Sequence, residues 1–270
     1  MMSLVRNARM LFSAKIKKMF QGSTDHELPG TGLSRRALSE ITPSEFAELV
    51  KVAALFPSMG GKEIGPFLRK LARTAPSNTA IVEVGSWLGA GTAQLALGLR
   101  ERGTDQSVTL HSYDRWIANK SEIEKAEQKA NISFSPNQDT LPWVMQALQP
   151  FGVGIKFVKG DIVVVNWAGG PISVYVDDAA KAPARFFHML RTFGPSWVPS
   201  VTVLVLMDFH YWEKTGSEDH KCQKYFMDAH LDHFAQIKDF RRASNAAFVY
   251  RKKLDFERLK FDSLLRPPQI

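Results

Sequence analysis

The stretch AIVEVGSWLGAGTA, residues 80–93, decides the fold. A short apolar run over 80–84 ends in a turn with three glycines, and the residues from Thr92 to Leu99 are typical of a helix. A buried strand, a glycine turn and a helix form the first half of a βαβ unit. The glycines permit a tight turn and a close approach of ligand to backbone, and the helix start offers free N–H groups.

The spacing of the glycines and one acid discriminate between ligand classes. A dinucleotide turn has the pattern G-x-G-x-x-G, which begins here at Gly89 but meets Gln94 at its last position. Glu83 places a carboxylate beside the turn, where it would repel a pyrophosphate and favour a ligand with an ammonium or sulfonium group. The alternative is a structural Glu83, paired with a nearby N–H or cation.

Residues 83–92, EVGSWLGAGT, resemble motif I (E/D-x-G-x-x-x-G-x-G) of the class I S-adenosylmethionine-dependent methyltransferases. Over roughly residues 60–251 the chain is most similar to bacterial small-molecule O-methyltransferases of the macrolide-sugar and catechol type. The resemblance implies an α/β fold with a doubly wound, mostly parallel seven-stranded sheet (Rossmann-like) and an N-terminal helical extension. It also implies S-adenosylmethionine as the cofactor.

Further apolar segments fit the other parallel strands, and each ends at a polar residue. These strands are expected over 108–113, 154–159, 171–176 and 201–207. Ligands of such sheets bind at the carboxyl ends of the strands. The residues expected at this edge are Glu83, Gly85, Asp114, Asp161, Asp177, Asp178, Asp208 and His210.

Most of these positions are expected to bind the cofactor. Asp114 would accept the ribose hydroxyls, and Trp116 would cover the adenine. Gly160-Asp161-Ile162 resembles the family's adenine-binding step, in which the Asp meets the exocyclic amine. The alternatives are a turn role for Asp114 and a core role for Trp116. The predicted cofactor-binding residues are Glu83, Gly85, Ser86, Gly89, Gly91, Thr92, Asp114, Trp116, Gly160, Asp161, Ile162 and Asp177.

Asp178, Asp208 and His210 follow the fourth and fifth strands and are expected on the acceptor side of the pocket. A hydroxyl nucleophile needs a base, or a metal that lowers its pKa. Either His210 is the base, oriented by Asp208 or Asp178, or the three residues hold Mg²⁺. Metal-dependent relatives usually carry Asp-Asp after the fifth strand and a His after the fourth-strand acid, whereas this chain has Met207 before Asp208 and AAK at 179–181. A loop histidine is the alternative for His210.

Composition narrows the class of protein. The chain has 270 residues, 44% hydrophobic and 23% charged, which is ordinary for a globular protein. The single cysteine, Cys222, excludes an intramolecular disulfide and fits a reducing, cytoplasmic compartment. A net charge of +8 fits anionic partners or solubility alone. No nucleic acid is expected as a partner, because no recognition motif is present.

Four parts are expected along the chain. They are a basic N-terminal helix and linker (1–36), a helical cap (37–76), the S-adenosylmethionine-binding methyltransferase domain (77–252) and a C-terminal tail (253–270). Residues 1–20 carry basic side chains and no acid, so this helix either lies on an anionic membrane surface or docks on its own domain or a partner subunit. Helices placed like the cap resemble those that close the cofactor pocket or build a homodimer contact.

The favoured hypothesis is O-methylation of a small-molecule acceptor, with an anionic or a sugar-containing compound both open. Two other hypotheses are a methyltransferase-fold protein that binds without catalysis and a nicotinamide-dependent oxidoreductase. The position of Gln94 and the carboxylate of Glu83 speak against the last.

Overall fold

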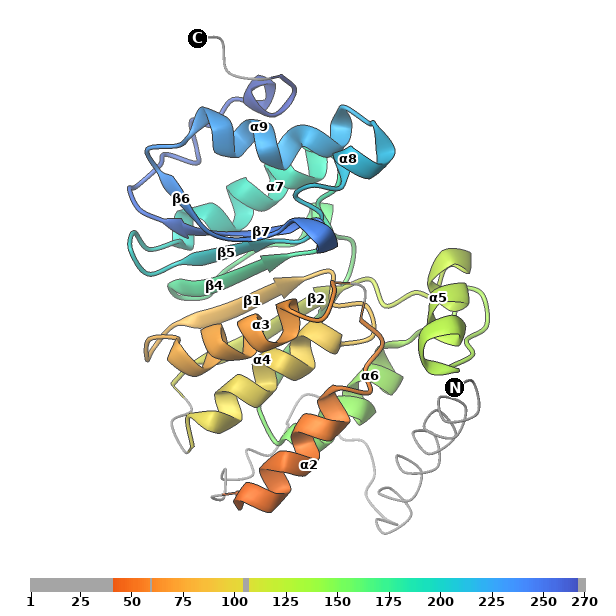
Figure 1. Ribbon diagram of the computed structural model, residues 1–270. Helices are drawn as coiled ribbons and strands as arrows, with labels where there is room; N and C mark the ends of the chain where they lie inside the picture. Colours follow the sequence, from red (N-terminus) through yellow and green to blue (C-terminus); the bar gives the residue numbers. More distant parts are fainter. Residues whose placement is uncertain (1–40, 59, 104–106, 267–270) are drawn as a thin grey trace.

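A seven-stranded sheet runs through the computed structural model, which describes residues 41–58, 60–103 and 107–266 (Figure 1). The strand order is β3-β2-β1-β4-β5-β7-β6; β7 is antiparallel to β5 and β6, and the other neighbours are parallel. The predicted doubly wound, mostly parallel α/β sheet is thereby confirmed. The strands are β1 Ala80–Val84, β2 Thr109–Asp114, β3 Ile155–Lys159, β4 Ile172–Asp177, β5 Val203–Leu206, β6 Phe234–Phe240 and β7 Asn245–Tyr250.

Helices cover both faces of this sheet (Figure 1). Helices α3 and α4 pack on one face, with α2 and α6 beside them, whereas α7 and α9 pack on the other. None of the described helices is long and apolar enough to cross a bilayer. The α-helices are α2 Pro43–Ala53, α3 Ile64–Thr74, α4 Ala90–Glu101, α5 Lys120–Ala130, α6 Leu141–Leu148, α7 Pro183–Phe193, α8 Trp212–Thr215 and α9 Cys222–Ala229.

The central strands divide the core in two, because successive side chains of a strand point to opposite faces. In β4, Val174 and Val176 join the core under α3 and α4, whereas Tyr175 joins the core under α7 and α9. In β1, Ile81 faces the α4 side. Glu83 lies two residues after Ile81 in the same strand, so its side chain is on the same face of the sheet and its carboxylate points toward α4 as well.

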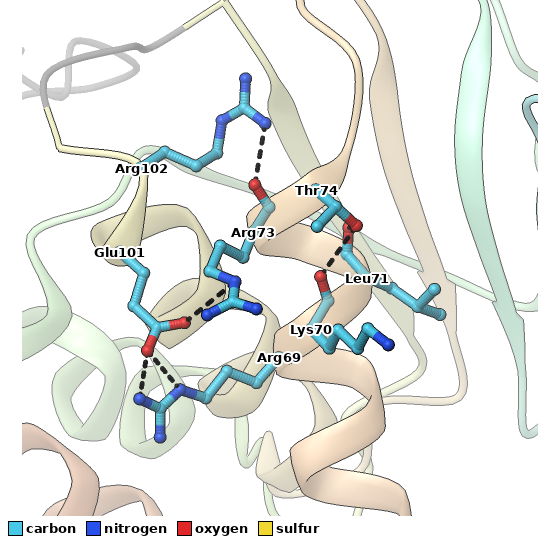
Figure 2. A network of polar contacts seen from close by, with 7 residues as sticks. All are labelled: Arg69, Lys70, Leu71, Arg73, Thr74, Glu101 and Arg102. Atoms are coloured by element: carbon cyan, nitrogen blue, oxygen red, sulfur yellow. Dashed lines mark hydrogen bonds and ion pairs between the residues drawn. The ribbon is translucent and has the colours of Figure 1, made fainter.

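Helix α3 is fastened closely to α4 (Figure 2). The Arg69 guanidinium pairs with the Glu101 carboxylate at the end of α4, and Arg102 donates to the carbonyl oxygen of Arg73 at 3.2 Å. Gly98 lies where the helices cross: a Cβ there would overlap the carbonyl oxygen of Arg69 and lie 3.0 Å from the nitrogen of Arg73. This packing fixes the position of α4, whose N-terminus completes the glycine turn.

Helix α2 begins directly after its N-cap residue, Thr42. The Thr42 side chain accepts the N–H of Glu45 at 3.2 Å, and the Glu45 carboxylate accepts the N–H of Thr42 at 2.8 Å, which is a capping box. Leu49 and Ala53 of α2 are buried in the core that α3 and α4 share. The predicted basic N-terminal segment, 1–36, lies outside the described residues.

Candidate functional site

The turns after β1 and β4 touch each other, and glycine makes this contact possible. Gly85 has a φ of +84°, and a Cβ on it would lie 2.8 Å from the carbonyl carbon of Asp178. The N–H of Asp178 donates to the oxygen of Val84 at 2.8 Å, and that of Gly85 donates to Tyr113 at 2.8 Å. Backbone hydrogen bonds therefore join the strand ends that the sequence places at one edge of the sheet.

Glu83 lies beneath the N-terminus of α4. The residue is 4% exposed, and its carboxylate accepts a hydrogen bond from the Thr92 hydroxyl. A Cβ at Gly91 would overlap Oε1 of Glu83, so this glycine leaves room for the carboxylate. Burial raises the pKa of Glu83 to about 7, the Thr92 hydrogen bond opposes that rise, and the charge of Asp114 adds to it.

The fit between Gly91 and Glu83 predicts a strong coupling between the two positions. Gly91→Ala is expected to lower the free energy of unfolding by about 1–2 kcal/mol, because the methyl group displaces a buried, hydrogen-bonded carboxylate. In a Glu83→Ala background the same substitution should be neutral or slightly stabilising, since alanine is the better helix former. Urea denaturation of the four proteins of this double-mutant cycle measures the coupling. Equal effects in both backgrounds would contradict the proposed fit.

The carboxylate of Asp114, at the end of β2, binds the backbone of two turns, each of which contains a tryptophan. Its carboxylate oxygens accept the N–H of Trp87 and the N–H of Trp116, each at 2.8 Å. Both tryptophans have a positive φ, +48° and +46°, a conformation that costs bulky residues energy. The sequence placed Asp114 at the ligand edge, and the structure adds that it stabilises the shape of that edge.

Trp116 was predicted to cover the adenine, but it belongs mainly to the core. It is 1% exposed, its indole N–H donates to the oxygen of Trp87 at 3.0 Å, and its ring packs edge-on against Phe157. Trp87 is only partly buried and is the more accessible ring at this edge. Both rings border a shallow hollow, which Asp114 and the α5–α6 segment also line.

Replacing Asp114 should therefore affect folding before any ligand is considered. Asp114→Ala is expected to lower the free energy of unfolding by about 1–2 kcal/mol, because two N–H groups in strained turns lose their acceptor. Asp161→Ala is the matched control, since the Asp161 side chain also accepts a backbone N–H, that of Val163 at 3.2 Å, but only this one within the described part of the chain. Urea denaturation measures the free energy of unfolding of both variants. If Asp114→Ala loses no more stability than the control, Asp114 does not stabilise the two turns.

The end of β3 lies next to Asp114. The N–H of Gly160 donates to the Asp114 carbonyl oxygen at 3.0 Å. Asp161 stays partly exposed, and Ile162, 8% exposed, begins a short 3₁₀ turn, Ile162–Val164. The structure thus brings Gly160, Asp161 and Ile162 to the edge where the sequence predicts them.

The two acids after β4 have different surroundings. Asp177 is fully buried and accepts the N–H groups of Ala179 and Ala180 at 3.1 and 2.9 Å, so it shapes the turn. Burial raises the pKa of Asp177 to about 6, against the effect of those hydrogen bonds. For Asp178, burial raises the pKa well above its usual range; Lys181 opposes this, and the charges of Asp208, Asp177 and Glu83 add to it. Asp178 follows β4, the strand between β1 and β5, so it lies between the glycine turn and the turn after β5.

The acceptor-side residues do not converge in the way the sequence predicts. The ammonium group of Lys181 lies 2.7 Å from the Asp208 carboxylate. His210 is buried; its Nε2 lies 3.0 Å from Asp239 and its Nδ1 3.6 Å from Glu213. His210 thus faces β6 and α8 and makes no ion pair or hydrogen bond with Asp208 or Asp178 among the described residues.

The predicted metal site is not supported. Within residues 41–58, 60–103 and 107–266, no group of three His, Cys, Asp or Glu side chains is arranged to hold a metal ion. The physical reason is that two of the three side chains have other partners. The ammonium of Lys181 pairs with the carboxylate of Asp208, and the imidazole of His210 pairs with Asp239. Asp178, Asp208 and His210 therefore do not form a shared ligand set.

Sequence reasoning missed two polar residues at this edge. Asn245 is 1% exposed; it accepts the N–H of Asp208 at 3.2 Å and donates to the oxygen of Gly60 at 3.0 Å, which ties the turn after β5 to the loop before α3. Gln223, in α9, is 3% exposed and borders a second hollow with Lys181 and Asp208. No local sequence pattern marks either residue, since both act through contacts distant in the chain.

Neither a protein-family model nor a curated protein matches the chain. Among solved structures, the chain resembles several methyltransferases in fold. The calicheamicin methyltransferase CalS11 is 14% identical, with 83% of this chain and 99% of that one covered and a TM-score of 0.47. The Podospora anserina methyltransferase PaMTH1, bound to S-adenosylhomocysteine, is 11% identical (85% and 100% covered, TM-score 0.47). An O-methyltransferase from Bacillus cereus is 18% identical (77% and 92%, TM-score 0.42).

Proposed function

We propose that the chain is an S-adenosylmethionine-dependent methyltransferase that methylates a hydroxyl group of a small molecule. The observation that carries the proposal is Glu83, a buried carboxylate beside the glycine turn with a pKa raised to about 7. Among the described residues no lysine, arginine or histidine forms an ion pair with it. Asp178 adds a second acid nearby. A ligand with a positive charge at this turn would stabilise both carboxylates, because unlike charges attract strongly where water is scarce.

The turn also has unsatisfied polar groups that suit such a ligand. Ser86 is 5% exposed, and its hydroxyl oxygen has no hydrogen-bond partner among the described residues. Gly89 caps α4 without a side-chain hydrogen bond, so the first N–H groups of the helix remain available. Residues of these kinds fit S-adenosylmethionine: acids for the ammonium and sulfonium groups, Asp114 for the ribose, and Asp161 with Ile162 for the adenine.

When bound, S-adenosylmethionine supplies a methyl group activated by a positively charged sulfur. The chain contributes alignment, since methyl transfer requires little beyond a nucleophile held in line with that methyl. Asp178 and the Lys181–Asp208 pair lie toward β5 from the glycine turn, on the side where an acceptor would approach. These groups would orient the acceptor hydroxyl and its departing proton.

The oxidoreductase hypothesis is weaker. In a dinucleotide site the pyrophosphate lies on the glycine turn at the helix N-terminus. Here that region contains the Glu83 carboxylate, and the position of the third glycine is Gln94. A carboxylate at this place would repel the two phosphates.

Calorimetry with the full chain tests the proposal. S-adenosylhomocysteine is expected to bind at micromolar concentration or better, with and without Mg²⁺, and NAD is expected not to bind. Incubation with labelled S-adenosylmethionine and a mixture of small hydroxylated compounds then tests transfer. Binding of NAD without a response to S-adenosylhomocysteine would overturn the proposal. Binding of S-adenosylhomocysteine without transfer to any hydroxyl compound would favour the non-catalytic alternative.

A further inference from the structure

One buried side chain, that of Asn245, connects the turn after β5 with the loop before α3. It is 1% exposed and begins β7, the strand that pairs with β5. Its Oδ1 accepts the N–H of Asp208 at 3.2 Å, and its Nδ2 donates to the carbonyl oxygen of Gly60 at 3.0 Å. The first partner can only donate and the second can only accept, so both agree on the orientation of the amide.

The Asp208 N–H is held differently from its neighbours in the turn after β5. The N–H of Met207 donates to a backbone oxygen, that of Asp177, at 2.9 Å. The N–H of His210 likewise donates to the oxygen of Ser244 at 2.9 Å. Asp208 has a φ of +69°, in the left-handed region, and its N–H donates to a side chain instead. Removing that side chain can therefore release this one residue while the backbone contacts of the turn remain.

The position of Asp208 matters because its carboxylate pairs with Lys181. The carboxylate lies 2.7 Å from the Lys181 ammonium, and the charge of Asp178 also acts on that ammonium. Lysine carries its charge at the end of a flexible stem, so the place of the ammonium follows the carboxylate that it pairs with. Asn245 thus acts on the pair through the backbone of Asp208.

We propose that Asn245 is a positioning residue for the acceptor side of the site: it holds the Asp208 backbone so that the Lys181–Asp208 pair stays where an acceptor hydroxyl would approach. The inference rests on the proposed methyltransferase function, because that function gives the pair its task. Loss of the Asn245 side chain is expected to loosen the pair and to leave the cofactor side unchanged. Both of its hydrogen bonds go to residues outside the predicted cofactor-binding set.

The test measures how fast formaldehyde and cyanoborohydride methylate Lys181 in the folded full chain. Mass spectrometry follows the reaction, with the exposed Lys120 of α5 as the internal standard. In Asn245→Ala, Lys181 is expected to react about threefold faster or more, because an ammonium released from its carboxylate loses its proton more readily. Asp208→Asn should show the same increase, and the double variant no further increase. Equal rates in wild type and Asn245→Ala, or additive effects in the double variant, would overturn the proposal.

Thr202→Ala is the matched control for a general loss of structure. Thr202 is also buried, and its hydroxyl accepts the N–H of Val198 at 2.7 Å and donates to the oxygen of Ile172 at 2.6 Å. It precedes β5, at the end of the strand opposite the site. This variant should lower the urea midpoint as Asn245→Ala does but leave the methylation rate of Lys181 unchanged. If both variants speed the reaction equally, Asn245 supports the fold and does not position the pair.

A conservative variant keeps the test sharp if Asn245→Ala does not fold. Asn245→Asp keeps a side chain of the same size with an oxygen at the same place, so the Asp208 N–H retains its acceptor. Lys181 should therefore react at the wild-type rate in this variant. Faster reaction in Asn245→Asp would refute the proposal.

Binding and transfer separate this proposal from the proposed function. S-adenosylhomocysteine should bind wild type and Asn245→Ala with equal affinity. If it binds neither, the cofactor assignment is refuted, whereas weaker binding by Asn245→Ala alone would overturn the positioning role. With an acceptor found by the labelled-methyl assay, Asn245→Ala should lower kcat about tenfold or more and leave KM for S-adenosylmethionine unchanged, because misplaced groups on the acceptor side slow transfer without touching the cofactor. A raised KM for S-adenosylmethionine with an unchanged kcat would contradict the assignment of Asn245 to the acceptor side.

Discussion

Gly98→Val is expected to lower the free energy of unfolding by about 3 kcal/mol or more, with Gly98→Ala costing about 2 kcal/mol. In an ordinary helix interior, glycine to alanine stabilises by up to about 1 kcal/mol. The sign reverses here because a Cβ at position 98 overlaps the carbonyl oxygen of Arg69, a backbone atom that moves only if α3 moves. Displacing α3 also separates the Arg69 and Glu101 partners shown in Figure 2.

The matched control lies in the same pair of helices. A Cβ at Gly65 of α3 would meet only the flexible side chain of Gln94, at 3.2–3.5 Å. Gly65→Ala should therefore be close to neutral. Urea denaturation of the three variants measures the series, and a stabilising Gly98→Ala would show that the two helices do not pack as described.

The sequence predicted the sheet well because its strands are nearly continuous apolar runs. Central parallel strands are covered by helices on both faces, so β1, β4 and β5 consist almost wholly of buried residues. Each such run ends at the edge where ligands bind, and polar residues stand out against an apolar background. The spacing of these polar residues along the chain was therefore enough to predict that Glu83, Asp114 and Asp178 lie at this edge.

The partners of the polar side chains could not be predicted. His210 lies in the turn after β5, and its sequence position suggests a neighbour of Asp208, but in the structure its ring faces Asp239 on β6. Asn245 begins β7 and is buried, and no local pattern in the sequence marks it. Both depend on how the antiparallel strands close the sheet, which is a long-range pairing without a local signal.

The three acids near the glycine turn make the folded protein sensitive to pH. Glu83 has a pKa of about 7 in the folded chain against an ordinary value of 4.5, so between these values the folded state holds a proton that the unfolded state has lost. Its contribution to stability is complete below about pH 4.5 and is lost as the pH rises through about 7. The raised pKa values of Asp177 and Asp178 act in the same direction.

Glu83→Gln is accordingly expected to change stability and affinity in opposite directions. Without ligand at pH 8 the variant should be more stable than wild type by on the order of 3 kcal/mol, because an amide replaces a buried charge while still accepting from Thr92. Its affinity for S-adenosylmethionine at pH 8 should fall about a hundredfold, since the positively charged ligand loses a buried partner. Glu127→Gln, at an exposed position of α5, should change neither quantity.

The pH dependence separates this explanation from a general loss of structure in Glu83→Gln. Wild type should bind S-adenosylmethionine more tightly as the pH rises through about 7, where Glu83 ionises, and the variant should show a flatter profile. Calorimetry in buffers of different ionisation enthalpy should detect proton release on binding below pH 7 in wild type, and less in the variant. If both proteins bind equally well at pH 8, the carboxylate of Glu83 does not face the cofactor. Its raised pKa would then describe a buried acid that only supports the glycine turn through Thr92.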